Sequence, residues 1–479
     1  MERAERDLAE LEQKVRTLAE REPRLNDFFA GVGEVVLARA PGRLDVIGGI
    51  ADYSGALVLE LPLEEATCVA AARTADDDED AWVQVASLGD VARDARFLAR
   101  DLWAACQSFE RLRGYFAGQD AAVAWAAYAL GGLVVLRERG AALTGGLRLL
   151  VDSAVPEGKG VSSSAALEVA ALAALAELWR VPLSGPELGL ACQQVENRVV
   201  GAPCGVMDQM TSACGRAGRL LALLCQPAEL RGFVALPEAV SVFGVDSGVR
   251  HAVVGADYRQ VRVAAFMGLR ILAERLGARV RASSDGKVVL EGDPLAGYLA
   301  NLRPDELTGS LREALPERIS GAEFLARFGG ISDLVTRVEP AAQYMVRAAT
   351  LHPIYEHQRA QELASELPNA TSTAQLVRLG GLMLASHASY SACGLGSDAT
   401  DEIVAALRGL GPKSGFFGAK VTGGGSGGTV SVLATTEALP RLRSAAADYA
   451  AKSGRASRVF AGSSPGAAAL PPRRIDLSR

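Results

Sequence analysis

A helical repeat of apolar residues opens the chain. Leu8, Leu11, Val15 and Leu18 recur three or four residues apart within otherwise charged sequence. That spacing puts apolar side chains on one face of a helix. We therefore predict that residues 1–30 form an N-terminal amphipathic helix, too charged for a secretory signal, that docks on the protein or dimerises.

Extended apolar runs follow, bounded by glycine, proline or acidic residues. They predict strands in "EVVLARAPGRLDVIGG" (34–49), "ALVLELPL" (56–63), "ATCVAAAR" (66–73) and "AWVQVASL" (81–88). The acidic run from Asp76 to Asp80 predicts an exposed loop tip rather than a metal site. Residues 145–180 predict a strand, a Pro/Gly loop and a long Ala/Leu helix that starts in serines.

The most apolar stretch, "AAVAWAAYALGGLVVL" (121–136), lies between Asp120 and Arg137. Sixteen residues fall short of the roughly 20 that span a bilayer. We predict one buried core helix and no membrane span.

The pattern changes near residues 225–245. Residues from about 257 to 410 predict mostly helices, and "FFGAKVTGGGSGGTVSVLA" (416–434) predicts a strand, a glycine loop and a second strand or helix. We place a domain boundary there, giving an N-terminal domain of residues 31–240 and a C-terminal domain of residues 241–479.

Composition narrows the functional classes. The 479 residues carry a net charge of −6, which argues against a nucleic-acid binder. Seven irregularly spaced cysteines contain no CxxC pair, so neither a zinc site nor a disulfide framework is expected. A reduced, cytoplasmic setting is the simplest expectation.

Three glycine-rich stretches carry candidate chemistry, and the first is "PEGKGVSSSAALEVA" (156–170). Glycines allow close backbone approach, and the free amides of a helix N-terminus bind phosphates. The serines either cap the helix or coordinate a cation. Because Gly160 follows Lys159, this is not a P-loop; Lys159 either contacts phosphate or is simply exposed.

The second stretch, "VENRVVGAPCGVMDQM" (195–210), predicts a helix followed by a tight loop that holds Asp208 among Gly201, Pro203 and Gly205. A carboxylate held there can accept a proton from a substrate hydroxyl, or simply bond its own backbone. Glu196, on the preceding helix, is a candidate metal ligand.

The third stretch, "KVTGGGSGGTV" (420–430), has five glycines in six positions. Such density does not suit a core strand. Its flanks are too apolar for a flexible linker, so we predict a loop whose backbone approaches a ligand.

With "GRLDVIGGIADYSGALVLELP" (42–62), these stretches resemble, in order, the motifs of the GHMP small-molecule kinases and the galactokinase signature. The similarity runs from about residue 36 to about residue 436 and includes "WAAYALGG", "LHPIYEHQR" and "LMLASHASYSACGLGSD". Within that family, "ARAPGRLDVIGGIADYSG", "PEGKGVSSSA" and "GAPCGVMDQMTSACG" are most similar to plant-type L-arabinokinases.

The resemblance implies an α/β (α+β) fold of two domains. The N-terminal α/β domain would carry the sugar and serine motifs, and a ferredoxin-like C-terminal domain would bring the third glycine loop. ATP and sugar would bind between them, with Mg²⁺.

The resemblance also implies residue roles in moving the ATP γ-phosphate to the anomeric hydroxyl of a sugar. Asp208 would be the catalytic base, and Arg43 would hold its carboxylate ionised and stabilise the moving phosphoryl group. Sugar contacts would be Arg43, Gly49, Ile50, Asp52, Gly205, Asp208 and Tyr258. Nucleotide contacts would be Pro156, Gly158, Lys159, Gly160, Val161, Ser162, Ser163, Ser164, Gly424 and Gly425. Metal ligands would be Ser164 and Glu196, and Asp45 is assigned a structural role.

One departure from the family pattern concerns the sugar. Galactokinases have "GEHTDY" where this chain has "GGIADY", so the residue expected at the sugar's 6-hydroxyl is Gly49, followed by Ile50. L-Arabinopyranose has the ring stereochemistry of D-galactose without that hydroxymethyl group. Since apolar pockets reject an added hydroxyl only about a hundredfold, the resemblance implies L-arabinose as substrate and D-galactose as a poorer one.

Other possibilities stay open: a galactokinase, a uronic-acid 1-kinase, or a sugar and ATP sensor without catalysis. A uronic acid is disfavoured because neither Gly49 nor Ile50 supplies a cation for its carboxylate. A sensor without catalysis is disfavoured because the candidate catalytic and metal-binding residues Arg43, Asp208, Ser164 and Glu196 are all present. Expected partners are the sugar and ATP, with no nucleic acid and no membrane. The sequence leaves a monomer and a homodimer equally open.

Overall fold

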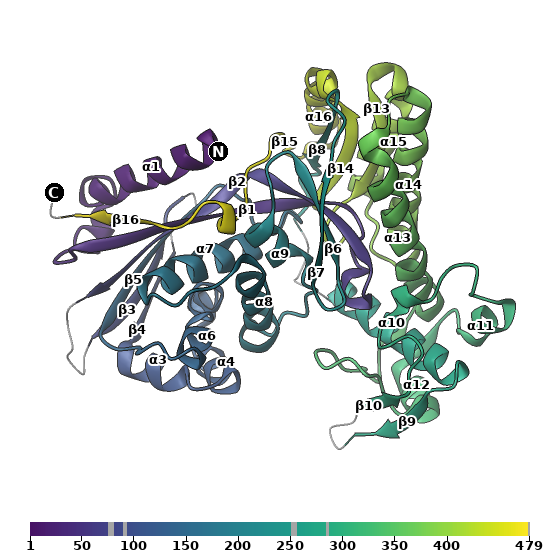
Figure 1. Ribbon diagram of the computed structural model, residues 1–479, viewed down its shortest axis with the longest axis horizontal. Helices are drawn as coiled ribbons and strands as arrows, with labels where there is room; N and C mark the ends of the chain where they lie inside the picture. Colours follow the sequence, from purple (N-terminus) through teal and green to yellow (C-terminus); the bar gives the residue numbers. More distant parts are fainter. Residues whose placement is uncertain (75–80, 90–92, 251–255, 284–286, 478–479) are drawn as a thin grey trace.

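The computed structural model describes residues 1–74, 81–89, 93–250, 256–283 and 287–477 (Figure 1). The predicted loop tip from Asp76 to Asp80 therefore lies outside the described residues. Two sheets organise the rest: an eight-stranded sheet built mainly from the first half of the chain, and a four-stranded sheet built from the second.

The first sheet has the strand order β16-β1-β2-β5-β3-β4, and β2 also pairs with β6, which pairs with β7. In the described part of this sheet, β3 and β5 are the only strands that pair in parallel. Its strands are β1 (Glu34–Ile47), β2 (Leu57–Thr74), β3 (Trp82–Ser87), β4 (Arg93–Leu98), β5 (Gly146–Ser153), β6 (Arg219–Leu224), β7 (Glu229–Ala235) and β16 (Arg473–Asp476). The strands predicted over residues 34–49 and 81–88 form as β1 and β3, but the two separate strands predicted over residues 56–63 and 66–73 are wrong: both stretches belong to the single long strand β2. Both β1 and β2 are buried along most of their length.

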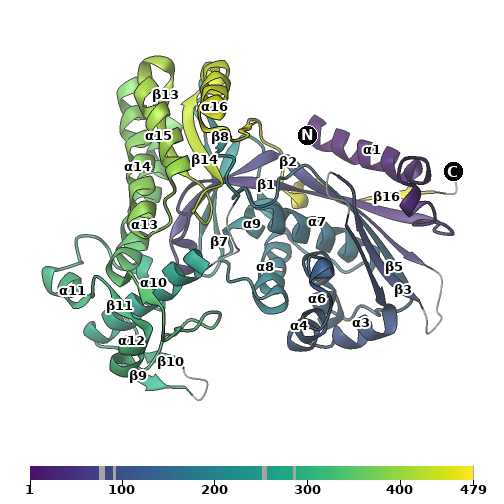
Figure 2. The same ribbon diagram turned by 180° about the vertical axis from the view of Figure 1, so that it is seen from behind.

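Helices cover both faces of this sheet (Figure 2). One face carries α3 (Ala99–Ala105), α4 (Phe109–Ala117), α5 (Ala126–Leu130), α6 (Leu133–Glu138), α7 (Ser163–Leu178), α8 (Gly185–Val195) and α9 (Met207–Cys214). The opposite face carries α1 (Glu2–Arg16) and α2 (Leu18–Arg21). The predicted amphipathic helix forms over Glu2–Arg16 rather than over all of residues 1–30, and α2 follows as a separate short helix. Leu8, Leu11 and Val15 are buried in one cluster with Leu37 and Ile475.

The prediction of a single helix over residues 121–136 is wrong. The chain forms a 3₁₀ turn and two short helices, α5 and α6, separated by Gly131 and Gly132. A Cβ at Gly131 would lie 2.3 Å from Val195 Cγ1, and one at Gly132 would lie 2.7 Å from Leu172 Cδ1. The glycines thus let this segment approach α7 and α8 closely, and it is a buried core element, as predicted. No helix among the described residues has the length and hydropathy needed to cross a bilayer.

The second sheet has the order β13-β14-β8-β15 and is antiparallel. Its strands are β8 (Val240–Asp246), β13 (Phe416–Val421), β14 (Thr429–Thr435) and β15 (Val459–Phe460). Helices packed with it are α13 (Val346–Glu366), α14 (Thr373–Ala392), α15 (Asp398–Leu410) and α16 (Leu439–Ser453). The order β8, helices, β13, β14, α16, β15 is the ferredoxin-like βαββαβ arrangement that was expected.

An insertion between β8 and α13 forms a lobe below the second sheet in Figure 1. It holds α10 (Ala256–Arg275), α11 (Gly309–Ala314), α12 (Gly321–Phe328) and the two-stranded pairs β9 (Arg279–Ala282) with β10 (Val288–Glu291) and β11 (Ile319–Ser320) with β12 (Gln343–Tyr344). The mostly helical content expected between residues 257 and 410 is confirmed.

The last strand crosses the predicted domain boundary. The second sheet begins with β8 at Val240, close to that boundary. However, β16 returns to the first sheet and pairs with β1 from Glu34 to Leu37. The predicted C-terminal domain of residues 241–479 therefore does not keep its own final strand.

Candidate functional site

The three glycine-rich stretches meet at one residue of β1, Arg43. The Arg43 amide donates to the carbonyl of Val161 in the serine loop at 3.1 Å. Arg43 Nη1 donates to the carbonyl of Gly160 at 2.7 Å. A Cβ on Gly423, in the third glycine loop, would lie 3.3 Å from Arg43 Nη2. Stretches separated by hundreds of residues thus share one buried guanidinium.

Arg43 is paired with Asp208, the candidate base. Its Nε and Nη2 both donate to Asp208 Oδ1, at 2.9 and 2.6 Å. Burial disfavours the guanidinium charge, but the charges of Asp208 and Glu60 outweigh it and raise the pKa of Arg43 above its usual value. The Arg43 side chain is 3% exposed and the Asp208 side chain 25% exposed. The carboxylate therefore faces a charged partner on one side and solvent on another.

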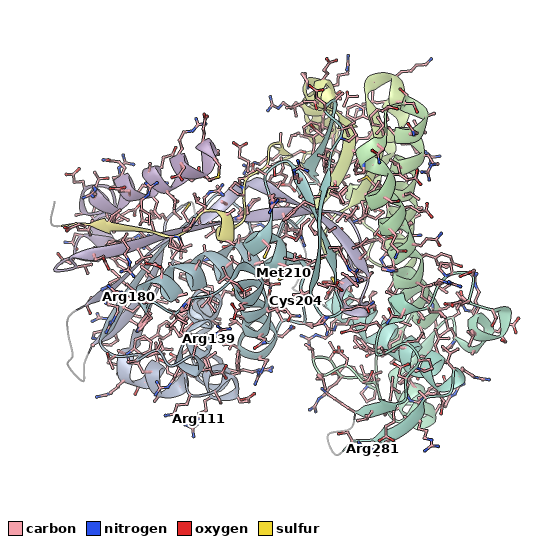
Figure 3. The ribbon with its side chains drawn as sticks, viewed as in Figure 1. Arg111, Arg139, Arg180, Cys204, Met210 and Arg281 are labelled. Atoms are coloured by element: carbon pink, nitrogen blue, oxygen red, sulfur yellow. The ribbon has the colours of Figure 1, made fainter. Side chains whose placement is uncertain are left out.

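The loop expected around Asp208 is in fact the first turn of a helix. Helix α9 begins at Met207, so Asp208 is its second residue. Free amides and the helix dipole stabilise negative charge at that position. Cys204 and Met210, on either side of Asp208 in the sequence, lie near the centre of the molecule in Figure 3.

A second acid contacts Arg43 and escaped the sequence analysis. Glu60 on β2 places Oε2 3.2 Å from Arg43 Nε. It is completely buried, and neither oxygen accepts a hydrogen bond from the described residues. Burial raises the pKa of Glu60 well above its usual range, and the nearby charge of Asp45 adds to this rise. A lone acid in the apolar run "ALVLELPL" was the available signal.

Asp52 and Gly205, two predicted sugar contacts, lie directly against each other. Asp52 Oδ1 accepts a hydrogen bond from the Tyr53 amide at 2.9 Å. A Cβ on Gly205 would lie 1.5 Å from Asp52 Oδ2, so only glycine fits there. Burial, and then the charge of Asp208, raise the pKa of Asp52 to about 6, while the Tyr53 amide and Arg262 oppose the rise.

Tyr258, a further predicted sugar contact, reaches this region from the insertion. It lies on α10 and is half-buried. Its ring centroid is 5.8 Å from that of Tyr53, and a Cβ on Gly424 would lie 3.6 Å from its Cδ2. The structure thus brings Tyr258 between the Asp52 turn and the third glycine loop.

Gly49 and Ile50 occupy a closed environment. A Cβ on Gly49 would lie 2.1 Å from both Asp45 Oδ2 and the Tyr390 hydroxyl oxygen. Asp45 is itself held by a completely buried ion pair with Lys420, at 2.6 Å. Ile50 is 0% exposed and has φ of +51°, a strained value for a β-branched residue. Neither residue presents a side chain to an open surface.

The serine loop runs from Pro156 through Gly158, Lys159, Gly160 and Val161 to the first turn of α7. Ser162 precedes the helix with φ of +61°, and its buried Oγ has no partner among the described residues. Ser163 and Ser164 begin α7. A Cβ on Gly423 would lie 2.9 Å from the Gly160 carbonyl, so the third glycine loop rests on the serine loop. Gly424 and Gly425 follow in the same loop.

Lys159 is neither free nor simply exposed. Its Nζ lies 3.0 Å from Asp246 Oδ2 at the end of β8. Thr429 Oγ1 donates to its carbonyl at 2.8 Å. Residue 159 therefore joins the serine loop to the second sheet.

Ser164 and Glu196, the predicted metal ligands, are adjacent. Burial, and then the charge of Asp208, raise the pKa of Glu196 to about 7, while a hydrogen bond from Ser164 opposes the rise. Gln209 Nε2 donates to both Glu196 and Glu168, whose Oε1 is buried without a partner among the described residues. A cation would relieve this repulsion among acids, so the residues fit Mg²⁺ held by few protein oxygens and by phosphates.

Three models of known protein families match the chain. The model of the GHMP kinases N-terminal domain matches residues 122–216, and that of the GHMP kinases C-terminal region matches residues 363–452. The galactokinase galactose-binding signature matches residues 26–73.

Two relatives and two solved structures extend these matches. An L-arabinokinase of Arabidopsis thaliana is 41% identical over 91% of this chain, which spans about half, 46%, of that relative. A galactokinase of Chloroflexus aggregans is 31% identical over 88% of this chain and 89% of its own.

The galactokinase of Lactococcus lactis, solved with galactose, has a TM-score of 0.70 at 20% identity and covers 94% of this chain and 98% of its own. A mevalonate kinase of L. major, solved with R-mevalonate, has a TM-score of 0.53 at 15% identity and covers 90% of this chain and 96% of its own. These structures share the fold. The family models and the relatives show more: the chain belongs to the galactokinase-like GHMP kinases.

Proposed function

We propose that this chain is an ATP-dependent sugar 1-kinase that converts L-arabinose to L-arabinose 1-phosphate and ADP. The observation that carries the proposal is the Arg43–Asp208 pair: Arg43 contacts the serine loop, and Asp208 is close enough to Asp52, which packs against Gly205, for its charge to raise the pKa of Asp52. The 41% identity to an L-arabinokinase supports L-arabinose as the substrate.

In this proposal Asp208 accepts the proton of the anomeric hydroxyl. Because both contacts from Arg43 go to Oδ1, that arginine does not occupy Oδ2. Arg43 keeps the carboxylate in place and supplies positive charge beside the phosphoryl group in transit. Phosphoryl transfer depends mainly on such positioning and charge neutralisation.

The nucleotide would lie where the serine loop and third glycine loop touch. The N-terminus of α7 supplies amides for phosphate oxygens, and the glycines keep the backbone close to them. Magnesium, held by Ser164 and Glu196, would neutralise charge on the ATP phosphates.

The sugar would contact Asp52, Gly205 and Tyr258, beside Gly49 and Ile50. A side chain at residue 49 has no room because Asp45 and Tyr390 fill that space. A sugar without a 6-hydroxymethyl group leaves no hydroxyl to satisfy there. This supports L-arabinose, with D-galactose as the second candidate because galactokinases are about 31% identical.

We also propose a cytoplasmic location. All seven cysteines lie in described residues and are free thiols, which suits a reducing compartment.

The test is a panel of L-arabinose, D-galactose, D-galacturonate and D-glucuronate with Mg·ATP. We expect sugar-dependent ADP release to be fastest with L-arabinose, and phosphorus NMR to place the phosphate on C1. Asp208→Asn should lower the rate of ADP release by about a thousandfold. Faster turnover of D-galactose would instead make the chain a galactokinase, and sugar binding without ADP release would make it a sensor.

A further inference from the structure

A second buried guanidinium lies beside the candidate sugar site, on helix α10. Arg262 is 5% exposed and makes polar contacts in two directions. Toward the insertion, its Nε and Nη2 donate to Asp333 Oδ2 and Oδ1, at 2.8 and 2.9 Å. Toward the N-terminal sheet, its Nη1 donates to the carbonyl oxygen of Cys204 at 3.1 Å. One side chain therefore bridges the insertion and the loop before α9.

Asp333 is itself held in place by hydrogen bonds, so it fixes the position of the Arg262 guanidinium. Besides the two bonds from Arg262, it accepts hydrogen bonds from the Val335 amide, the Thr336 amide and the Thr336 hydroxyl. Burial opposes its charge, but the Arg262 guanidinium outweighs this and lowers the pKa of Asp333. The two-pronged geometry fixes direction as well as distance.

The contacts of Arg262 lead to both halves of the Asp52–Gly205 contact. Cys204, whose carbonyl it binds, immediately precedes Gly205. The ring of Tyr53, which immediately follows Asp52, has its centroid 5.4 Å from Arg262 Cζ. Gly205 lies so close to Asp52 that there is no room for a Cβ between them. A small shift of either residue would therefore separate the two.

We propose that Arg262, anchored by Asp333, is a positioning residue that holds Asp52 and Gly205 together and thereby sets the affinity for the sugar. The inference rests on the proposed function. It adds that the insertion between β8 and α13 takes part in sugar recognition through a residue that need not touch the sugar. Nucleotide affinity should not depend on it, because its polar contacts are with Asp333 and Cys204.

The experiment compares Arg262→Gln, Arg262→Lys and Asp333→Asn with a control on the same helix. Arg270 is also 5% exposed and forms an ion pair with Glu274 at 2.9 Å. Arg270→Gln therefore removes an equally buried arginine whose ion pair lies within α10. For each variant we would measure kcat, the KM for L-arabinose and D-galactose, the KM for ATP, and sugar affinity by calorimetry without nucleotide.

We expect Arg262→Gln to raise the sugar KM and calorimetric Kd by about 10- to 100-fold, the usual effect of losing a charge-assisted hydrogen bond. Arg262→Lys should recover part of this loss, because an ammonium keeps the charge but cannot make the fork and the carbonyl bond together. Asp333→Asn should show a smaller rise. In each case the ATP KM and kcat should change less than about threefold, and Arg270→Gln should leave the sugar KM unchanged.

Three outcomes would overturn the proposal. The first is an unchanged sugar KM in Arg262→Gln, and the second is an equal rise in the KM for sugar and ATP. The third is a sugar KM raised equally by Arg270→Gln, which would mean general loosening of α10. If Arg262→Gln does not fold, Arg262→Lys and Asp333→Asn decide the matter in the same way. An unmodified protein that turns over none of the sugars would refute the proposed function instead.

Discussion

Two arginine–aspartate pairs flank the candidate sugar site and differ in how they use the carboxylate. Arg43 directs two donors at one oxygen of Asp208, whereas Arg262 gives one donor to each oxygen of Asp333. The Asp208 side chain is 25% exposed and that of Asp333 is 3% exposed. Asp333 also accepts three hydrogen bonds from Val335 and Thr336.

The two carboxylates differ in how much hydrogen-bonding capacity they have left for a ligand or a proton. A carboxylate offers about four lone-pair sites, and Asp333 has them all engaged. Asp208 is held by Arg43 through one oxygen, and its side chain remains 25% exposed in the first turn of α9, so a proton can still reach it. In the functions proposed above, the Arg43–Asp208 pair takes part in the reaction, whereas the Arg262–Asp333 pair holds other residues in position.

The largest effect should come from isosteric amides at the two aspartates. We expect Asp208→Asn to lower kcat by about a thousandfold, within the range for loss of a general base, with little change in sugar Kd. Asp333→Asn should do the reverse, raising sugar Kd and sparing kcat. Initial rates of ADP release and calorimetry separate the two. Similar kcat losses in both variants would show that Asp208 and Asp333 do not differ in this way.

A conservative change of the first arginine should have the next largest effect. Arg43→Lys keeps the charge but cannot contact Asp208 and the Gly160 carbonyl together, so we expect kcat to fall by about a hundredfold. The control is Arg39→Lys, which alters another buried arginine of β1 that contacts Asp7, Ser464 and Glu64. Its effect should appear in the melting temperature rather than in kcat.

Asp52 connects the two pairs, because the charges of both Asp208 and Arg262 influence its pKa. We expect its titration to make both the stability of the protein and the sugar KM depend on pH. Its pKa is raised from 3.8 to about 6. The folded state therefore binds the Asp52 proton more tightly than the unfolded state does. Stability from this group is present below about pH 4 and is lost as pH rises through 6, by about 3 kcal/mol at most.

Asp52→Asn should accordingly raise the melting temperature at pH 8 and leave it nearly unchanged at pH 4, relative to the unmodified protein. The sugar KM of the unmodified enzyme should increase below pH 6, because the protonated acid accepts fewer hydrogen bonds from sugar hydroxyls. A pH-independent difference in melting temperature would contradict the raised pKa.

Glu60→Gln should have the smallest effect, although Glu60 lies 3.2 Å from Arg43. Burial raises the pKa of Glu60 well above its usual range, which favours the protonated, neutral carboxyl. Glutamine resembles that neutral carboxyl in shape, and we expect kcat to change less than about threefold. A loss of tenfold or more would mean that Glu60 is charged and competes with Asp208 for Arg43.

Local patterns predicted the elements and motifs that depend on nearby residues. The leucine repeat of α1, the serine start of α7 and the strand–loop–strand around Gly423 to Gly428 each follow from spacing or composition. The structure also places Arg43 against Asp208, the pairing that the family resemblance implied.

The features that were predicted wrongly or not at all depend on contacts between residues that are far apart in the sequence. Asp208 lies in a helix rather than a loop, and residues 121–136 divide into two short helices at Gly131 and Gly132, where the packed Val195 and Leu172 leave no room for a Cβ. Arg262 and Glu60 look like ordinary charged positions in sequence; only the packing shows that both are buried beside the site. The signal available for Arg262 was its place on a helix between Val261 and Val263, which are themselves buried.

The return of β16 to β1 has a practical consequence for dividing the chain. A fragment ending near residue 240 would lose Arg473 to Asp476 and leave the backbone groups of Glu34 to Leu37 unpaired at the sheet edge. Open edges of this kind recruit other strands and promote aggregation. Because the polypeptide passes between the two sheets twice, once on the way out and once on the way back, we expect the halves to be expressed successfully only as one continuous polypeptide.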